Sequence, residues 1–544
     1  MEFSSRRSSF SDGTQCVVRR IRSLFPVGVR TEITELCKLA GPVTLSQLMV
    51  FMVSFVSTIF CGHLGRTELA GVSLAIAVIN VTGISIGTGM ASACDTLISQ
   101  TFGSHNLLRV GIILQRAILI LILACFPCWA LLINTELILL AVRQKPEVAK
   151  LAQLYVNIFM PALPATFMYS LQTRYLQNQG IIWPQVITGF MVNLFNALIN
   201  YIVLHVFNMG VAGSALANTL SQFLMAGLLF AYIIWQGLHK ATWSGWSKQC
   251  LLDWSSYIHL AVPGMIMLCV EWWTYEIGSL LAGLISEVEL GAQSVVYELA
   301  NVAYMFPFGF SIAGSVRVGQ ALGAGQTEQA KLSAKTTVIC ATSVSVCLAI
   351  LIGTLKNHIS YIFTFDEQIR ERVADVISFY APFVLLDAVS AAAGGVIRGA
   401  GKQRVGAICN FIGYYGIGFP IGVPLMFAAK LGIKGLWTGL FTCVVLQSAF
   451  LLFYLIRMNW TNVTVEAQVR AGVIESCTET SERGQQPDDQ TDYHDETDTV
   501  ELVDMKMKLS HRAAVLRRGM VLVGMLFILA AGIIMNLVIT NLVT

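Results

Sequence analysis

Long apolar stretches separated by short polar ones dominate the pattern of this chain. Crossing the hydrocarbon core of a bilayer takes about 20 apolar residues in a helix, and thirteen runs are about that long or longer. The expected helices cover residues 36–61, 67–94, 109–133, 151–173, 183–207, 210–236, 255–283, 288–316, 332–355, 372–397, 405–429, 431–456 and 519–541. The pattern therefore predicts an all-α polytopic membrane protein.

The first six runs and the next six repeat one another. One constant shift, which carries Pro42 onto Pro263, superimposes identical residues over long spans without gaps. The further matches include Glu68 with Glu289, Asn80 with Asn301, Pro161 with Pro382 and Gly180 with Gly401. Because the shift covers an even number of helices, we expect two six-helix bundles in parallel orientation, related by an axis along the membrane normal. A cavity between them is the expected substrate site; the alternative is a duplication without mechanistic use.

Polar segments divide the chain around these bundles. Residues 458–516 are rich in Thr, Glu, Asp, Ser and Gln and poor in aromatic residues, which predicts a disordered linker. The expected segments are an N-terminal segment (1–35), a first half (36–237), a loop (238–254), a second half (255–457), the linker (458–516) and a thirteenth helix with the C-terminus (517–544).

Composition and charge agree with this class and suggest an orientation. Hydrophobic residues make up 55% of the chain and charged residues only 12%, against about a quarter charged in soluble domains. A net charge of +3 gives no sign of a nucleic-acid partner. Lys and Arg gather before residue 36, in the loop 238–254 and at the turns after the eighth and tenth helices. The positive-inside rule then places the N-terminus in the cytosol and the C-terminus outside.

Carboxyl groups inside the second half break the apolar pattern. Glu271, Glu298 and Asp387 lie near the middle of their predicted helices, and Glu276 lies nearer the outer end. Placing an acid at this depth costs several kcal/mol. The shift that aligns the repeat pairs these acids with neutral residues, namely Val50, Ala77, Thr166 and Phe55. The duplicated scaffold therefore does not by itself require the acids.

The acids and their neighbours form the candidate site. A carboxyl group without a basic partner at similar depth can hold either a proton or a cation, which is the chemistry of a proton/cation antiporter. Tyr275 and Tyr297 add hydrogen-bonding groups, and the rings of Trp272 and Trp273 could hold an organic cation. The alternatives are protonated contacts between helices for the acids, and packing for the tryptophans.

The helical geometry separates two of these acids. Glu271 and Glu276 are five residues apart, so on a regular helix their side chains point about 140° apart. We therefore do not expect them to share one carboxylate site.

The apolar runs lack the motifs of other kinds of chemistry. No paired aspartate, zinc motif or nucleophile arrangement occurs there, and the phosphate-binding pattern GxxxxGK[ST] is absent. A receptor or membrane-embedded enzyme is therefore disfavoured, and an ATP-driven pump is not expected. We expect a carrier that uses protons and needs no cofactor or metal.

Several long stretches carry a resemblance to a known family. They are CGHLGRTELAGVSLAIAVINVTG (61–83), SACDTLISQTFGS (92–104), EWWTYE (271–276), ELGAQSVVYELANV (289–302) and GYYGIGFPIG (413–422). Over about residues 35–456 the chain resembles the vertebrate branch of the multidrug and toxin extrusion family, which also has a thirteenth helix. The resemblance implies an organic cation/proton antiporter that exports drugs, toxins and cationic metabolites through the plasma membrane, with an apical location.

The resemblance also bears on individual residues. It implies substrate and proton sites in the second half, where Glu271, Glu276, Glu298 and Asp387 match the family's intramembrane acids. The usual acid at the last of these positions is Glu, one methylene longer.

The chain departs from the family pattern in the first half as well. Many bacterial members have an aspartate in the first helix, where this chain has Gln47. Gln47 and Asn80 are candidates for hydrogen bonds to substrate. A sodium-coupled multidrug carrier and a lipid-type flippase of a related fold remain alternatives, although acids at the midplane disfavour a flippase that holds phosphate with basic residues.

Overall fold

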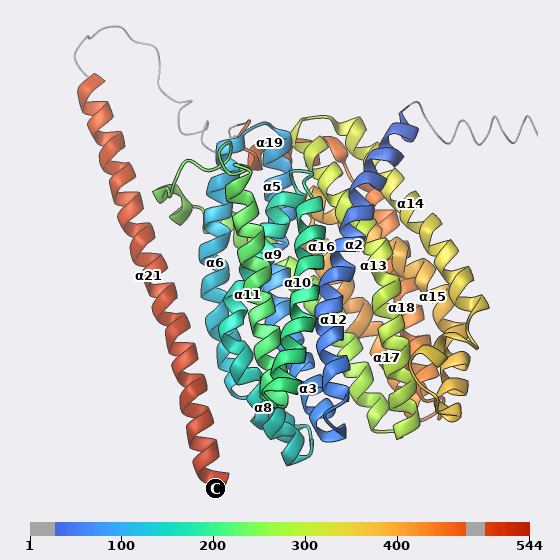
Figure 1. Cartoon of the computed structure of the whole chain (residues 1–544). Coiled ribbons are helices and arrows are strands. Elements are labelled where there is room, and N and C mark those ends of the chain that lie inside the picture. The colour runs from blue at the N-terminus through green and yellow to red at the C-terminus, as the bar shows by residue number, and fades with distance from the viewer. Residues whose placement is uncertain (1–27, 475–495, 544) are drawn as a thin grey trace, which may run out of the picture.

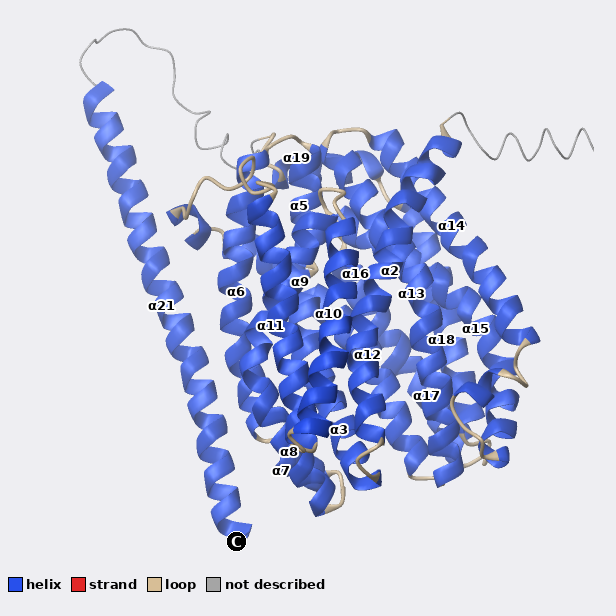
Figure 2. Cartoon of the chain, in the orientation of Figure 1, coloured by secondary structure: helices blue, strands red, loops and turns tan. Residues whose placement is uncertain are grey.

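The computed structural model describes residues 28–474 and 496–543. Within these residues the chain is helical and contains no strand (Figure 2). The helices run side by side, and α21 lies at the edge of the bundle (Figure 1). Each half has its own buried apolar cluster, one centred on residues such as Tyr155 and Phe159 and the other on residues such as Trp437 and Phe383.

The first half contains six membrane-crossing segments. They are α2 (Val29–Gly62); α3 (Arg66–Ile79) continued by η1 (Asn80–Ile84), α4 (Ser85–Ala91) and α5 (Ala93–Gly103); α6 (Leu107–Ile133), followed by the short α7 (Thr135–Ala141); α8 (Pro146–Phe159) continued by η2 (Met160–Ala162) and α9 (Leu163–Gln177); α10 (Trp183–Tyr201) with η3 (Ile202–Val206); and α11 (Val211–Trp235).

The second half repeats this plan and is followed by two further helices. After η4 (Lys248–Leu251) come α12 (Trp254–Gly283), α13 (Glu287–Gly323), α14 (Thr327–Thr354), η5 (Ile359–Ile362), α15 (Glu367–Ala400), α16 (Gln403–Phe411) continued by η6 (Ile412–Gly418) and α17 (Phe419–Phe427), and α18 (Ile433–Arg457); α19 (Trp460–Arg470) and α21 (Glu496–Val543) follow.

The thirteen predicted spans agree with these helices. In the described part of the chain, twelve helices are long and apolar enough to cross a membrane. The remaining span is α12, which contains Glu271 and Glu276 and is therefore less apolar. Its 30 residues give a length of about 45 Å, and it packs between α4 and α16. Most helices extend several residues beyond the apolar runs.

The expectation of a disordered linker over residues 458–516 is wrong at both ends. Residues 460–470 form α19, whose apolar side buries Trp460, Val463 and Ala467. The Asn459 side chain caps this helix by accepting a hydrogen bond from the Asn462 backbone N–H at 3.2 Å. The last helix was expected from residue 517 but begins at Glu496. Residues 475–495 of the expected linker lie outside the described residues.

The last helix, α21, packs against α6. Two asparagines fasten it: Asn134 Nδ2 donates to the Gly532 carbonyl at 3.1 Å, and Asn536 Nδ2 donates to the Ile133 carbonyl at 3.2 Å. The C-terminal end of α21 lies at the end of the bundle opposite α19 (Figure 1). We call the end that carries α19 and the start of α2 the α19 end.

Candidate functional site

Glu271 and Asp387 form the inner pair of predicted acids. Glu271 lies on α12 and Asp387 on α15, and the two carboxyl groups lie within electrostatic range of each other. Tyr304 on α13 lies within electrostatic range of Glu271. None of the ion pairs formed by the described residues includes either acid. Both carboxyl groups are half-buried, so the pair can exchange a proton or accept a cation.

Glu276 and Glu298 form a second, separate pair. The two carboxyl groups lie within electrostatic range of each other, and the Tyr297 hydroxyl donates to Glu276 Oε1 at 3.3 Å. Sequence position led us to expect Glu298 beside Glu271 and Asp387, but the structure places it with Glu276. The separation of Glu271 from Glu276 along α12 is as expected, because the turn of the helix directs them to different neighbours.

Aromatic rings connect the two pairs. The Tyr275 ring lies 5.8 Å from the Tyr297 ring and 6.2 Å from the Trp437 ring, measured between centroids. Tyr275 and Tyr414 are both within electrostatic range of Glu271 and Asp387. The result is a continuous set of polar and aromatic side chains in the second half.

Trp273 is the predicted site residue that reaches the other half. Its Nε1 donates to the Val81 carbonyl at 3.0 Å, and Val81 belongs to the π-helical segment η1. This hydrogen bond fastens Trp273 between the halves. Trp272 is half-buried beside it.

Gln47 and Asn80 lie in the first half, on α2 and at the start of η1. Both are half-buried. Within residues 28–474 their side chains make no hydrogen bond, so each is free to pair with another group. Asn80 precedes Val81 and therefore lies beside the place where Trp273 meets the first half.

Sequence reasoning missed four members of this set. Three of them, Tyr304 on α13, Tyr414 on η6 and Arg398 on α15, lie within electrostatic range of Glu271. The fourth, Trp437 on α18, has its ring beside that of Tyr275. Arg398 also lies within electrostatic range of Asp95 of the first half. Tyr414 belongs to the stretch GYYGIGFPIG, which resembles the family pattern. That resemblance did not show that Tyr414 lies near the acids.

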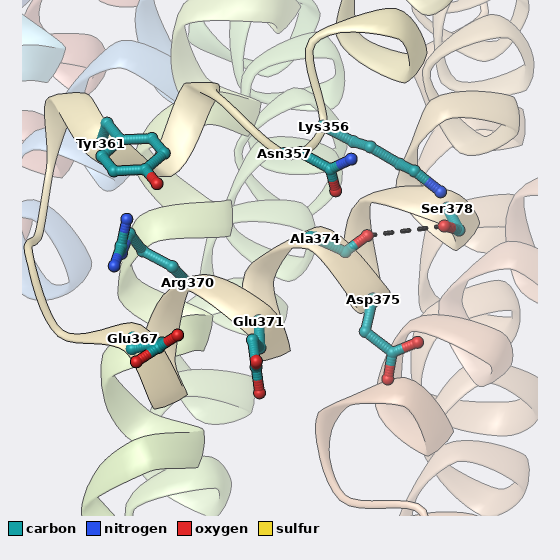
Figure 3. A pocket seen from close by; sticks show the side chains of 9 residues that line it. All are labelled: Lys356, Asn357, Tyr361, Glu367, Arg370, Glu371, Ala374, Asp375 and Ser378. Carbon is teal, nitrogen blue, oxygen red and sulfur yellow. Dashed lines mark hydrogen bonds between the residues drawn. The ribbon is translucent and has the colours of Figure 1, made fainter.

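A cavity of about 450 Å³ lies elsewhere, at the end of the bundle opposite α19. Its lining is mixed in charge and includes Lys356, Glu367, Arg370 and Glu371 (Figure 3). The Arg370 guanidinium lies 4.1 Å from the centre of the Tyr361 ring. None of the predicted site residues lines this cavity.

The chain is similar in sequence to a known family along most of its length. The MatE family model matches it twice, over residues 42–202 and 263–423, and these two ranges are related by the same shift that aligns the repeat. Multidrug and toxin extrusion protein 1 of Danio rerio is 59% identical, over 95% of this chain and 92% of that protein. Multidrug and toxin extrusion protein 1 of Homo sapiens is 50% identical, over 95% of this chain and 96% of that protein.

A solved structure shares the fold. The crystal structure of the eukaryotic MATE transporter AtDTX14 superposes with a TM-score of 0.79 at 27% identity, covering 82% of this chain and 100% of that one.

Proposed function

Because the chain belongs to the MatE family of multidrug and toxin extrusion transporters, we propose that it exports organic cations in exchange for protons. It is a multi-pass membrane protein and not an enzyme. The observation that carries the proposal is the pair Glu271 and Asp387, two carboxyl groups that no Lys or Arg of the described residues neutralises in an ion pair.

The proposed cycle uses competition for these carboxyl groups. A cation from the cytosol binds while at least one carboxyl group is ionised, and the ring of Tyr275 lies beside it. When the site opens to the outside, protons neutralise the carboxyl groups and the cation leaves, because a neutral acid no longer attracts it. The protonated carrier returns and releases its protons inside. A second acidic binding site lies nearer the outer end and consists of Glu276, Glu298 and Tyr297.

We further propose that the α19 end faces the cytosol of a plasma membrane. Basic residues near this end, among them Arg317, Lys331 and Lys402, support this orientation by the positive-inside rule. The C-terminal end of α21, at the opposite end of the bundle (Figure 1), would then be extracellular.

Purified protein in liposomes tests this proposal. A proton gradient should drive uptake of a labelled quaternary ammonium cation in the absence of sodium. The substitution Glu271→Gln removes the exchangeable charge and should lower this flux at least about a hundredfold, since it removes a group on which binding and release both depend. Glu328→Gln, at an exposed glutamate paired only with Lys331, is the matched control and should transport normally.

The same vesicles decide between the alternatives. A pair of carboxyl groups can also hold sodium, so a sodium-coupled multidrug carrier is the second candidate. Flux that follows a sodium gradient and ignores the proton gradient would favour it. A lipid flippase is disfavoured, because the inner pair is acidic and would repel phosphate.

A further inference from the structure

A buried carboxylate joins the two halves at the α19 end. Glu32, in the first turn of α2, has only 2% of its side chain exposed. Its Oε1 accepts from Arg317 Nε at 3.0 Å and from the Ser333 hydroxyl at 2.7 Å. Its Oε2 accepts from Arg317 Nη2 at 2.6 Å and from Gln329 Nε2 at 2.7 Å. Each oxygen therefore accepts two hydrogen bonds.

All four donors belong to the other half of the molecule. Arg317 is on α13, and Gln329 and Ser333 are on α14; both helices lie beside α2 at this end (Figure 1). A buried carboxylate is tolerated only while it is paired and hydrogen-bonded. Moving the halves apart here removes every partner of Glu32 at once, so this contact opposes opening more strongly than an exposed ion pair would.

The internal repeat contains a contrasting position. The shift that aligns the repeat places Glu32 on Asp253, which precedes α12. Asp253 also approaches the other half, but its side chain is 54% exposed and lies 3.9 Å from Arg116. The duplication thus kept an acid at both positions, while only the one on α2 became buried and fully hydrogen-bonded.

Further contacts between the halves lie on the same side of the bundle. Gln100 on α5 donates to the Gly399 carbonyl at 2.9 Å, and Gln320 on α13 donates to the Asn178 carbonyl at 2.9 Å. In residues 28–474, no hydrogen bond between the halves lies farther from the α19 end than the one from Trp273 to Val81. In the described part of the two halves, hydrogen bonds therefore close the α19 end and none joins the halves at the opposite end.

We propose that the hydrogen bonds of Glu32 to Arg317, Gln329 and Ser333 hold the cytosolic end of the transporter closed. We call this set of contacts the lock, and Glu32 is its positioning residue. The inference rests on the proposed function, because only a carrier with alternating access must open this end in each cycle. The four hydrogen bonds of Glu32 form in the outward-open state and break in the inward-open state.

Solvent reaches the lock from the arginine side. A cavity of about 440 Å³ at the α19 end is lined by His105, Arg317, Gln320 and Gln329. Arg317 is 27% exposed, whereas Glu32 is 2% exposed. Water can therefore reach the guanidinium more readily than the carboxylate.

Transport kinetics test the lock. Glu32→Gln weakens the closed state, so the inward-open state becomes more populated. Both KM for a labelled cytosolic cation and kcat should then fall, each by about tenfold, with kcat/KM little changed. A merely structural role would lower the apparent kcat and leave KM unchanged. The control Asp253→Asn should change neither constant.

A double-mutant cycle tests whether Glu32 and Arg317 act as one unit. If they form one lock, adding Arg317→Gln to Glu32→Gln should cost much less than the two single effects combined. Additive effects, or a Glu32→Gln variant with unchanged KM and kcat, would overturn the proposal. If Glu32→Gln fails to fold, Arg317→Lys keeps the charge but loses the two-pronged contact, and it should show the same fall in both constants at smaller size.

Hydrogen–deuterium exchange measures how often the lock opens without a transport assay. Backbone amides of residues 29–36 and 327–336 should exchange faster in Glu32→Gln than in the wild type and in Asp253→Asn. If exchange is faster in Glu32→Gln but the wild type shows no proton-driven flux, the lock is supported and the proposed function is contradicted. If exchange is unchanged in Glu32→Gln and the wild type shows normal proton-driven flux, the lock is refuted and the proposed function is not.

Discussion

Three glutamates, one buried and two half-buried, show how local partners decide what an acid does. Glu32 has four donors from the opposite half. Glu289 is held within its own half by Arg372 Nε at 2.7 Å and by the Ile433 backbone N–H at 2.8 Å. Glu271 lies within electrostatic range of Tyr304 and has no ion-pair partner among the described residues. The least satisfied acid is the one best suited to exchange its proton.

Glu289→Gln should therefore affect stability and not coupling. The ion pair with Arg372 joins α13 to α15, and the bond to Ile433 joins α13 to α18. Loss of the charge should lower the free energy of unfolding by about 1–3 kcal/mol, while KM for the cation and the dependence on the proton gradient stay unchanged. Thermal unfolding in detergent, measured together with flux, checks this; altered coupling in a stable variant would count against the assignment.

Tyr304→Phe should affect transport and not stability. The substitution keeps the ring and removes the hydroxyl, the one group of this side chain that can donate a hydrogen bond to Glu271. A hydrogen bond to a charged group is worth about 1.5–3 kcal/mol, so proton-driven flux should fall about tenfold or more, with a thermal midpoint close to that of the wild type. A normal rate would show that this hydroxyl has no part in the exchange.

The acids themselves could be located from sequence, but their pairing could not. Hydropathy identifies a carboxyl group inside an apolar run without any structure. Whether Glu298 meets Glu271 or Glu276 depends on the relative rotation of α12 and α13, which packing sets and which no single helix encodes. For the same reason Arg398, Tyr304 and Tyr414 were missed.

At the scale of elements, close backbone contact brings α5 against α13. Gly323 on α13 faces Gln100 on α5, and a side-chain carbon there would overlap the Gln100 carbonyl. Gly323→Ala should force these helices apart and favour the inward-open state, so that KM and kcat fall together as in Glu32→Gln. Gly227→Ala is the control, because an added side-chain carbon there would meet no described atom of another helix within 4 Å. Equal behaviour of the two variants would argue against this closure.

The helix α19 also belongs to this closure. Arg470 Nη1 donates to Gln100 Oε1 at 3.3 Å, and Glu466 pairs with Lys402 at 2.8 Å. Burial lowers the pKa of the Arg470 guanidinium, yet Glu466 favours its charged form. A chain that ends after residue 474 should keep proton-driven transport, whereas one that ends after residue 459 should lose most of it. Equal flux through the two truncated proteins would show that α19 is dispensable.

Helix existence could be read from the sequence more reliably than helix ends or irregularities. Apolar runs predict each span, but α19 was hidden because a few apolar residues on one side of a short helix are diluted by a polar stretch. The π-helical segments η1 and η6 were not foreseen either. They supply Val81 and Tyr414 to the site, and π-helical turns recur at functional sites.

For the whole molecule, the internal repeat predicted the architecture, since the one register that carries Pro42 onto Pro263 holds across both family matches. Sequence could not show which end is closed, because closure depends on contacts between the halves. Within the described residues, hydrogen bonds between the halves extend from the α19 end as far as Trp273 and Val81. Glu271 and Asp387, which have no Lys or Arg partner there, lie within the second half. This is the arrangement of a carrier closed at one end.

Proton movement coupled to cation movement tests the central claim most directly. Liposomes containing the protein and an internal pH-sensitive dye, without sodium and without an initial pH gradient, receive a quaternary ammonium cation outside. Entry of the cation should expel protons and raise the internal pH with the wild type, and should leave it unchanged with Glu271→Gln. Entry of the cation without any change of internal pH would contradict proton exchange.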